Sequence, residues 1–419
     1  MPGHTVYGVL PLGVWFGPCV LMYGSFYSAE PASGEQQKLK ITLTSNSEGW
    51  DTAVNGELLL ELARNSRVKV SGLVPKGTEK QRAHAKSLGI ELVDAKDVPG
   101  YSPSELLAHP PDSLDIDILI IHSYGCELGR QAQVIKEAKK CKWIHVLHTV
   151  SEELVKFPET ASEHESEHEI QVTLCQQADA VIAIGPKVAD AYRSALRFCG
   201  KDKDVIDLTP GIFNNFIGVR PSQQDREVFH VLISGSLKYF KVKGCDIAAK
   251  AVKLLNTTSH MYNLVFVVKP GQDVAEITHA LLSEGIKADH LTVRVSESNE
   301  DWIRLLSEVD LVIKPSRMEG FGMSGLRAIS ADLPLLISEN SGLAMALNKL
   351  PSGRKSVVDS EDSQVWADKI REVKEKGSQT SRSQAEELRN EYLKQFNWKE
   401  QCDQLVTKMY AMIPTKDGM

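Results

Sequence analysis

The residues with the clearest chemical potential lie between Lys314 and Pro334, in the sequence Lys-Pro-Ser-Arg-Met-Glu-Gly-Phe-Gly-Met-Ser-Gly-Leu-Arg-Ala-Ile-Ser-Ala-Asp-Leu-Pro. The run at 310–313 predicts a strand that leads into a Pro-Ser turn. A Glu-Gly-Phe-Gly loop at 319–322 follows, and then a helix with small residues on its buried side. Unpaired N–H groups and the helix dipole converge where a Gly-rich turn meets a helix N-terminus. This segment therefore predicts an anion-binding site.

Other chemically useful side chains stand at the ends of expected strands. Gly235 and Ser236 follow one apolar run, and Lys243 precedes the next expected helix. His122 and His148 each end an apolar run in the first half of the chain. Ligands of open α/β sheets bind outside the carboxyl ends of the strands, so both histidines can meet a ligand there. The alternatives stay open: each histidine can simply cap its strand, and the lysine can be an exposed side chain on a turn.

The 314–334 segment closely resembles the donor-sugar loop of retaining family-4-type glycosyltransferases with the GT-B fold. The resemblance covers nearly all of the chain after residue 38. The chain is also similar to the glycosyltransferase-like domains of invertebrate multidomain proteins. The family signature has two glutamates separated by seven residues. Glu319 matches the first of them, and Arg327 stands at the second.

A second family motif, Gly-Arg followed by Lys-Gly, holds the donor diphosphate at the start of the second domain. Gly235 and Lys243 match this motif, whereas Ser236 replaces the arginine. Lys238 and Lys241 are the candidates to compensate for the lost positive charge. Because side chains offset the charge of the departing nucleotide in this family, the resemblance implies that no metal is required.

The resemblance implies a transferase that moves a hexose, with retention, from a nucleotide sugar to an unknown acceptor. The nucleotide sugar is then a co-substrate, and no cofactor is expected. The implied site residues are, for catalysis, His148 and Glu319; for donor binding, Gly235, Ser236, Lys243, Arg317, Gly320, Phe321, Gly322 and Arg327; and on the acceptor side, Gly49, Trp50 and His122. Loop carboxylates aimed at a ligand contribute little to a core, so Glu319 is expected to matter for transfer and little for stability.

A catalytically impaired GT-B-like module that binds a nucleotide, a sugar or a protein partner is the alternative. The residues that favour it depart from the family pattern: Trp50, Ser236, Lys269, Arg327 and Asp332. An arginine has only donors and cannot accept hydrogen bonds from ribose hydroxyls, as the glutamate of the family does. Arg327 can instead attract a phosphate or pair with Glu319. Fold alone does not establish activity.

The elements that must position these residues alternate between short apolar strands and longer amphipathic helices. Strand-like runs occur near 39–44, 68–73, 116–121, 143–147 and 180–184, and the alternation restarts at 228–233. This pattern predicts an α/β protein with two doubly wound, Rossmann-like domains that face a cleft. The expected domains are a leader at 1–37, an N-terminal acceptor-side domain at 38–220 and a C-terminal nucleotide-sugar-side domain at 221–396. By the resemblance, a C-terminal helix at 397–419 crosses back to the N-terminal domain.

Composition limits the other function classes. A net charge of −7 over 419 residues argues against a general binder of nucleic acid or acidic membranes. Seven scattered cysteines without C-x-x-C spacing indicate reduced thiols, and they support neither a disulfide framework nor a zinc site. Residues 1–29 contain no Asp, Glu, Lys or Arg, but they lack the basic start of a signal peptide and are interrupted by prolines. A cytoplasmic protein is therefore expected and membrane association is not favoured, with a signal peptide or membrane anchor at residues 1–29 as the weaker alternative.

Overall fold

The first half of the chain forms alternating strands and helices, as expected. The computed structural model describes residues 38–45, 53–122, 128–219, 226–257 and 261–414. The elements of the first half are β1 Leu39–Ser45, α1 Ala53–Arg64, β2 Val68–Val74, α2 Glu79–Ser87, β3 Glu91–Asp94, α3 Pro103–Leu106, β4 Ile118–His122, α4 Gly129–Lys139, β5 Lys142–Leu147, α5 Ser151–Leu154, α6 Ala161–Gln177, β6 Ala180–Ile184, α7 Pro186–Leu196 and β7 Val205–Leu208.

The second half repeats this alternation and ends in three helices. Its elements are β8 Phe229–Ser234, α8 Cys245–Leu255, β9 Tyr262–Val268, α9 Val274–Ser283, β10 Leu291–Val295, α10 Asn299–Glu308, β11 Leu311–Lys314, α11 Met323–Ser330, β12 Leu335–Ser338, α12 Gly342–Leu347, β13 Val357–Val358, α13 Ser363–Glu375, α14 Ser378–Gln395 and α15 Trp398–Met412. Short 3₁₀ turns at Arg197–Cys199, Asp202–Asp204, Asn214–Phe216, Ala288–His290 and Gly353–Ser356 connect some of the elements of both halves.

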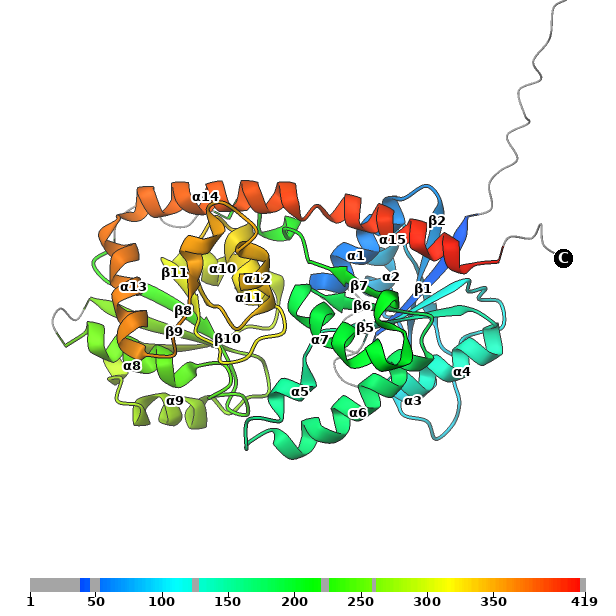
Figure 1. Ribbon diagram of the computed structural model, residues 1–419, viewed down its shortest axis with the longest axis horizontal. Coiled ribbons are helices and arrows are strands. Elements are labelled where there is room, and N and C mark those ends of the chain that lie inside the picture. The colour runs from blue at the N-terminus through cyan, green and yellow to red at the C-terminus, as the bar shows by residue number, and fades with distance from the viewer. Residues whose placement is uncertain (1–37, 46–52, 123–127, 220–225, 258–260, 415–419) are drawn as a thin grey trace, which may run out of the picture. The chain divides into compact units, whose positions relative to one another are not determined.

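Two parallel sheets organise the described residues. One has seven strands in the order β3-β2-β1-β4-β5-β6-β7, and the other has six in the order β10-β9-β8-β11-β12-β13. Helices lie on both faces of each sheet (Figure 1), so the central strands are continuous apolar runs, and every residue of β4 and β6 is buried. The expected α/β class with two Rossmann-like sheets is confirmed. The expected leader and the boundary at 220/221 lie outside the described residues, so the domain limits stay a prediction.

The last helix, α15, packs on α1 of the first half, and the crossing back is confirmed. Leu405, Val406 and Met409 are buried on its inner face. At the far end of the helix, the Tyr410 hydroxyl donates to the Arg67 carbonyl at 2.6 Å. No helix in the described part of the chain is long and apolar enough to cross a membrane.

The segment that follows β7 connects the two halves and is held by the C-terminal helices. The Tyr392 hydroxyl donates to the Pro210 carbonyl at 2.7 Å, and the Trp398 indole N–H donates to the Ile212 carbonyl at 3.1 Å. The Phe213 N–H donates to the hydroxyl of Ser330 in α11 at 3.0 Å. The connection is therefore fixed to the same helix that follows the Glu-Gly-Phe-Gly loop.

Candidate active site

The loop between β11 and α11 brings Glu319 between two lysines. The carboxylate Oε1 lies 2.8 Å from Lys243 Nζ, and Oε2 lies 3.2 Å from Lys314 Nζ. The Ser316 hydroxyl donates to Oε2 at 3.3 Å. Burial alone would raise the pKa of Glu319, but the two ammonium groups outweigh it and lower the pKa to about 2. Glu319 is therefore an anion at neutral pH. One of its two partners, Lys243, is a residue that the sequence predicts in the same site.

Glycine is required where this loop meets the end of β5. A Cβ on Gly320 would lie 2.3 Å from the His148 carbonyl oxygen, so only glycine allows this approach. Gly322 has a φ of +114° and precedes the first turn of α11. Gly320, the residue after Glu319, therefore packs against the backbone of His148. Glu319 follows a strand of one sheet, and His148 follows a strand of the other.

Phe321 in the same loop faces the protein interior. Its side chain is buried, and a Cβ on Gly185 would lie 2.4 Å from its ring. Gly185 has a φ of +87° and directly precedes α7. The aromatic ring therefore packs the loop onto α7.

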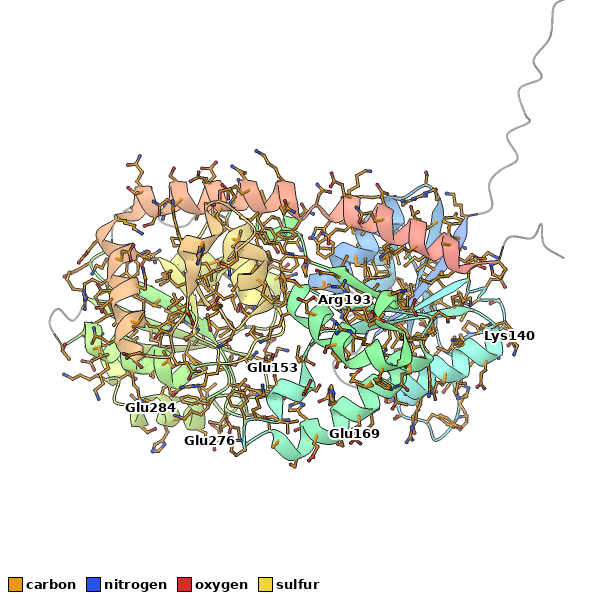
Figure 2. All side chains as sticks on the ribbon, viewed as in Figure 1. Lys140, Glu153, Glu169, Arg193, Glu276 and Glu284 are labelled. Carbon is orange, nitrogen blue, oxygen red and sulfur yellow. The ribbon has the colours of Figure 1, made fainter. Side chains whose placement is uncertain are left out.

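A pocket of about 510 Å³ opens beside this contact. It is lined by α5 and α7 of the first half and by Arg317, Met318 and Asn340 of the second. Lys187 crosses it: its Nζ lies 2.7 Å from a carboxylate oxygen of Glu153 and donates to the Asn340 carbonyl at 3.0 Å. Glu153 is labelled on α5 in Figure 2. The pocket thus joins both halves next to the Glu319 loop.

Lys243 and Gly235 are positioned by close packing at the start of α8. A Cβ on Gly244 would lie 2.0 Å from the Pro315 carbonyl oxygen, which keeps the turn after Lys243 against the Glu319 loop. A Cβ on Gly235 would lie 2.7 Å from Cys245 Sγ. Ser236 follows as a half-buried residue. The motif residues predicted around Lys243 therefore do lie at the edge from which Glu319 projects.

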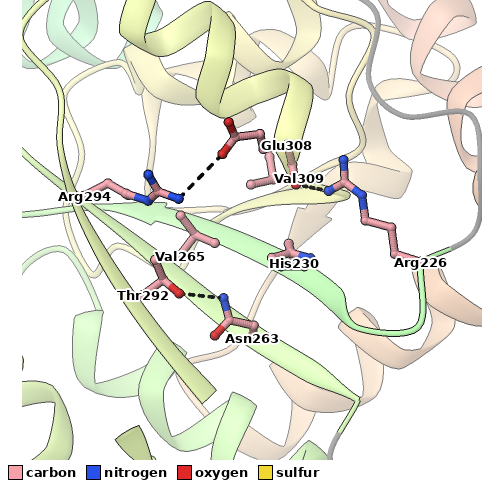
Figure 3. A pocket seen from close by; sticks show the side chains of 8 residues that line it. All are labelled: Arg226, His230, Asn263, Val265, Thr292, Arg294, Glu308 and Val309. Carbon is pink, nitrogen blue, oxygen red and sulfur yellow. Dashed lines mark hydrogen bonds and ion pairs between the residues drawn. The ribbon is translucent and has the colours of Figure 1, made fainter. Parts of the chain in front are cut away.

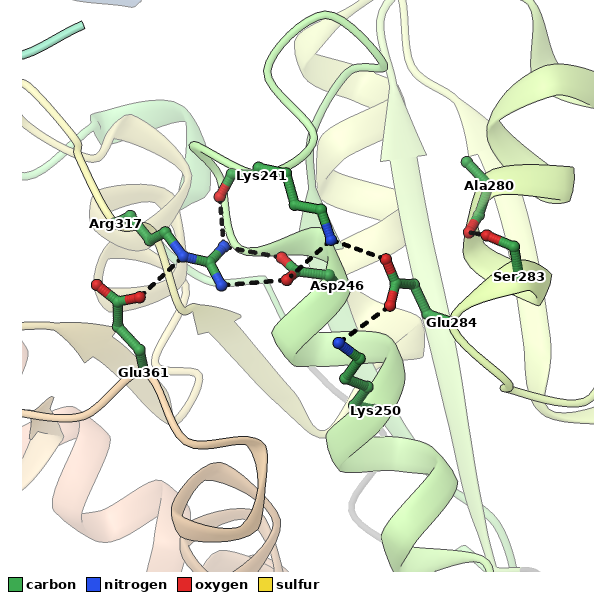
Figure 4. Close-up of polar contacts among 8 residues, drawn as sticks. All are labelled: Lys241, Asp246, Lys250, Ala280, Ser283, Glu284, Arg317 and Glu361. Carbon is green, nitrogen blue, oxygen red and sulfur yellow. Dashed lines mark hydrogen bonds and ion pairs between the residues drawn. The ribbon is translucent and has the colours of Figure 1, made fainter. Parts of the chain in front are cut away.

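Arg317 and Lys241, two further cations near the Glu319 loop, form ion pairs with neighbouring carboxylates (Figure 4). Arg317 contacts both oxygens of Asp246, at 2.8 and 3.1 Å, and a carboxylate oxygen of Glu361 at 2.9 Å. Lys241 lies 3.2 Å from Asp246 and 2.9 Å from Glu284. Arg317, expected to bind the donor, is thus placed by the structure where it connects two loops to α8.

The two histidines predicted from the sequence lie together at the carboxyl ends of β4 and β5. The ring centroids of His122 and His148 are 4.2 Å apart. Burial lowers the pKa of His148 to about 3, with a further contribution from His145, and it lowers the pKa of His122 well below its usual value. Both rings are therefore neutral at physiological pH. As neutral imidazoles they can donate or accept a hydrogen bond, but they do not carry a charge.

Residues 44–405 match the family described as "Family 4 Glycosyltransferase in conflict systems". The chain belongs to this glycosyltransferase family. A D-inositol 3-phosphate glycosyltransferase from Corynebacterium urealyticum is 21% identical over 71% of the chain and 72% of its own length. Another from Mycolicibacterium smegmatis is 31% identical over 28% of the chain and 26% of its own length.

Solved structures show the same GT-B fold. A sucrose-phosphate synthase from Thermosynechococcus elongatus superposes with a TM-score of 0.66 at 17% identity, over 90% of this chain and all of that one. The Anabaena protein HepE, in complex with UDP and glucose, superposes with a TM-score of 0.63 at 16% identity, over 89% of this chain and all of that one. The GT-B architecture expected from the sequence is therefore confirmed.

Arg327 stands where the resemblance to family-4-type glycosyltransferases places a second glutamate, and two aromatic rings lie near its guanidinium. The guanidinium carbon lies 4.6 Å from the ring centroid of Trp302 in α10 and 5.8 Å from that of Phe216. Glu319 is paired with lysines, so the suggested Arg327–Glu319 pair is not what the structure shows. Arg327 instead stacks between α10 and the connection from the first half.

The second pocket lies at the opposite ends of the strands and is a poor candidate for the donor. It has a volume of about 270 Å³ and is lined by residues such as His230, Asn263 and Arg294 (Figure 3). His230 and Asn263 stand near the starts of β8 and β9. Ligands of α/β sheets bind at the carboxyl ends of the strands, so this groove does not compete with the Glu319 site.

Lys314 and His145 are neighbours of the site that the sequence reasoning missed. Lys314 is the last residue of β11 and pairs with Glu319. His145 Nε2 lies 2.8 Å from Gln171 Oε1 beneath the other histidines. A lysine at the end of an otherwise apolar strand was a usable signal. Gly49 and Trp50, expected on the acceptor side, lie outside the described residues. Within the described ranges, no group of three or more His, Cys, Asp or Glu side chains could hold a metal ion.

Proposed function

We propose that this protein is a retaining hexosyltransferase that takes its hexose from a nucleotide sugar and passes it to an acceptor that is still unknown. Family membership supports glycosyl transfer. The presence of UDP and glucose in the HepE structure supports a nucleotide-sugar donor, with UDP as the first nucleotide to test.

The observation that carries this proposal is the meeting of Glu319, Lys243 and the end of β5. Glu319 is ionised and lies 2.8 Å from Lys243, and Gly320 lies against the His148 carbonyl. In the proposed complex, Glu319 and the backbone of 320–322 hold the sugar hydroxyls. Lys243 holds the diphosphate, and the neutral His148 ring offers a hydrogen bond from the acceptor side.

The proposed reaction needs neither a metal nor a protein nucleophile. Lysine side chains stabilise the negative charge that develops on the leaving nucleoside diphosphate. The leaving phosphate assists attack by the acceptor on the same face of the sugar, which retains the configuration of the anomeric carbon. The protein then contributes orientation and a positive environment, and the neutral histidines need not transfer a proton.

We place this activity in a reducing compartment, the cytoplasm. The buried thiols of Cys175, Cys245 and Cys402 have pKa values raised by burial, which favours the protonated thiol. Such thiols are compatible with a reducing environment.

The stacking of Arg327 favours the second candidate function, a binding module without transfer. With its guanidinium between Trp302 and Phe216, this side chain offers no carboxylate to ribose hydroxyls. A protein of this kind binds a nucleoside diphosphate or a sugar and does not turn it over.

Calorimetric titration with UDP, GDP, ADP and the corresponding nucleotide sugars, all in EDTA, tests the proposal. We expect one nucleotide sugar to bind, and its nucleoside diphosphate to be released on incubation. Binding without release would favour the binding module. The absence of binding by every member of the panel would contradict the proposed transferase.

A further inference from the structure

Lys314 is a buried cation at the end of the strand that leads into the Glu319 loop. Its side chain is 5% exposed, and its ion pair is with Glu319 Oε2 at 3.2 Å. A buried ammonium group is costly unless it is paired and hydrogen-bonded. Burial accordingly lowers the pKa of Lys314, although Glu319 opposes that shift. The free-energy cost of burying the Lys314 ammonium group therefore needs a physical explanation.

The charges around Glu319 do not balance. Lys243 and Lys314 share its single carboxylate. Besides burial, the side chains with the largest effects on the pKa of Lys314 are Glu319, Lys243 and the Cys245 thiol, whose own pKa burial raises to about 12. The thiol is uncharged at neutral pH, so the cluster carries one excess positive charge. An excess charge in a partly buried cluster favours an anion of opposite sign.

The position of Lys314 places that charge beside the Gly235 turn. In the parallel pairing of β11 with β8, Val312 lies opposite Leu232. Two residues further along, Lys314 therefore reaches the same edge as Ser234, and Gly235 and Ser236 follow directly. The resemblance implies an arginine at the position of Ser236, and the strand register places Lys314 at the same edge of the sheet as that position.

Lys238 and Lys241, the other two lysines that could compensate for the missing arginine, form ion pairs with other carboxylates. Lys241 lies between the carboxylates of Asp246 and Glu284, at 3.2 and 2.9 Å. Lys238 is about half exposed and pairs with Glu163 on α6. Neither contacts Glu319, whereas Lys314 does.

We propose that Lys314 supplies the second positive charge of the donor-diphosphate site, in place of the arginine that Ser236 replaces. Glu319 neutralises this charge until the diphosphate binds. The phosphate oxygens then become the partners of Lys243 and Lys314, and the carboxylate turns to the sugar hydroxyls. The assignment rests on the proposed function, because it names the ligand as the diphosphate of a nucleotide sugar.

Titration with inorganic pyrophosphate in EDTA tests this role separately from glycosyl transfer. Lys314→Met should weaken pyrophosphate binding at least about tenfold, the loss expected for one charge-assisted hydrogen bond. Lys241→Met removes the same charge from the neighbouring network. It should weaken pyrophosphate binding by less than about threefold, because Lys241 already serves two carboxylates.

Glu319→Gln gives the opposite test and still applies if Lys314→Met does not fold. Removing the internal anion while keeping the shape of the side chain should tighten pyrophosphate binding by about tenfold. A purely structural role for Lys314 predicts lower thermal stability of Lys314→Met, and pyrophosphate affinity that is unchanged when Lys314→Met is added to the wild type or to Glu319→Gln. That result would overturn the assignment, as would a wild-type protein that does not bind pyrophosphate. If these changes occur but no nucleotide sugar is turned over, the anion site stands and the proposed transfer activity is wrong.

Discussion

Glu319 shows how one residue can serve both the fold and the ligand site. Its carboxylate neutralises Lys243 and Lys314, so it contributes to stability as well as to the proposed donor contacts. The expectation that a loop carboxylate has little effect on stability does not fit this geometry. The reason is that removing one partner of a buried pair leaves the other charge uncompensated.

Glu319→Ala should therefore abolish transfer and also lower the free energy of unfolding, by about 1–3 kcal/mol. Nucleoside diphosphate release and urea unfolding measure the two effects. Glu361→Ala, which removes an exposed carboxylate from Arg317, is the control. It should leave the free energy of unfolding within about 1 kcal/mol of the wild type. Full turnover by Glu319→Ala would remove Glu319 from the site.

Arg327 should contribute to stability through its aromatic contacts. Replacing it by glutamate puts a negative charge over the faces of Trp302 and Phe216, where the ring quadrupole repels it. We expect Arg327→Glu to lower the free energy of unfolding by about 1–2 kcal/mol, and Arg327→Lys to lower it less.

The same variant separates the two functions considered for Arg327. If a carboxylate at this position can reach the ribose, Arg327→Glu should strengthen nucleotide-sugar binding despite the lower stability. Weaker binding would show that the arginine itself contributes to the ligand site. If Arg327→Glu is as stable as the wild type, the aromatic contacts of Arg327 do not contribute to the free energy of unfolding.

The sequence could predict the position of a site residue where a motif places its backbone at the end of a strand or the start of a helix. Glu319, Lys243 and His148 follow strands or precede helices, and all three lie at the carboxyl edge of a sheet. The direction of the Arg327 side chain could not be predicted in the same way. It depends on Phe216 and Trp302, which the tertiary structure brings to α11 from other parts of the chain.

At the scale of elements, the contact between the Glu319 loop and the end of β5 decides the geometry of the site. Gly320→Ala would place a Cβ 2.3 Å from the His148 carbonyl oxygen, so the two segments must separate. We expect loss of turnover and a lower melting temperature. Gly271→Ala is the control for backbone strain without a contact, because its φ of +80° is unfavourable for alanine and open space surrounds it, whereas Gly320 is not in the positive-φ region. Equal loss of turnover in both variants would argue that general destabilisation of the fold, and not this contact, is the cause.

His145, a buried histidine within β5, should make the free energy of unfolding depend on pH. His145 is fully buried, and burial lowers its pKa to about 4 although Gln171 hydrogen-bonds to it. Below the usual pKa of histidine, near 6.5, the unfolded chain binds a proton that the folded protein does not, so acidification favours unfolding. This stability is complete above about pH 6.5 and is progressively lost as the pH falls towards 4.

Urea unfolding at about pH 7 and about pH 5 measures this effect. Replacing His145 by glutamine should reduce the difference in free energy of unfolding between the two pH values by about 1–2 kcal/mol. His279→Gln is the control, because His279 lies on α9 away from this cluster. The same pH dependence in wild type and His145→Gln would show that His145 is not the source.

The order and type of the elements could be predicted from periodicity, because both faces of each parallel sheet are covered and the strands are continuous apolar runs. The run near 68–73 is β2, and the run near 180–184 is β6. The acidic segment at 159–169 was harder to interpret. Its charges are typical of a solvated surface, but most of it belongs to α6, where His164 is buried and its Nε2 lies 3.2 Å from the Tyr239 hydroxyl of the second half.

At the scale of the whole molecule, the C-terminal helices bind the second half to the first. Leu405 is 2% exposed on the face of α15 that packs on α1. Leu405→Ala should lower the free energy of unfolding by about 2–5 kcal/mol, the usual cost of a cavity in a core. Lys408→Ala, on the exposed face of the same helix, should change it by less than about 0.5 kcal/mol. Equal effects in urea unfolding would mean that α15 does not pack as described.

Release of nucleoside diphosphate from a panel of UDP-, GDP- and ADP-sugars tests the central claim most directly. The assay is made in EDTA, with water or an added sugar as acceptor, on wild type and Glu319→Ala. The account predicts slow release from one donor by the wild type, insensitivity to EDTA and loss of release in Glu319→Ala. Release that requires a metal, or that is unchanged in Glu319→Ala, would contradict the proposed mechanism. If a donor binds and no diphosphate is released, the protein is a binding module and not a transferase.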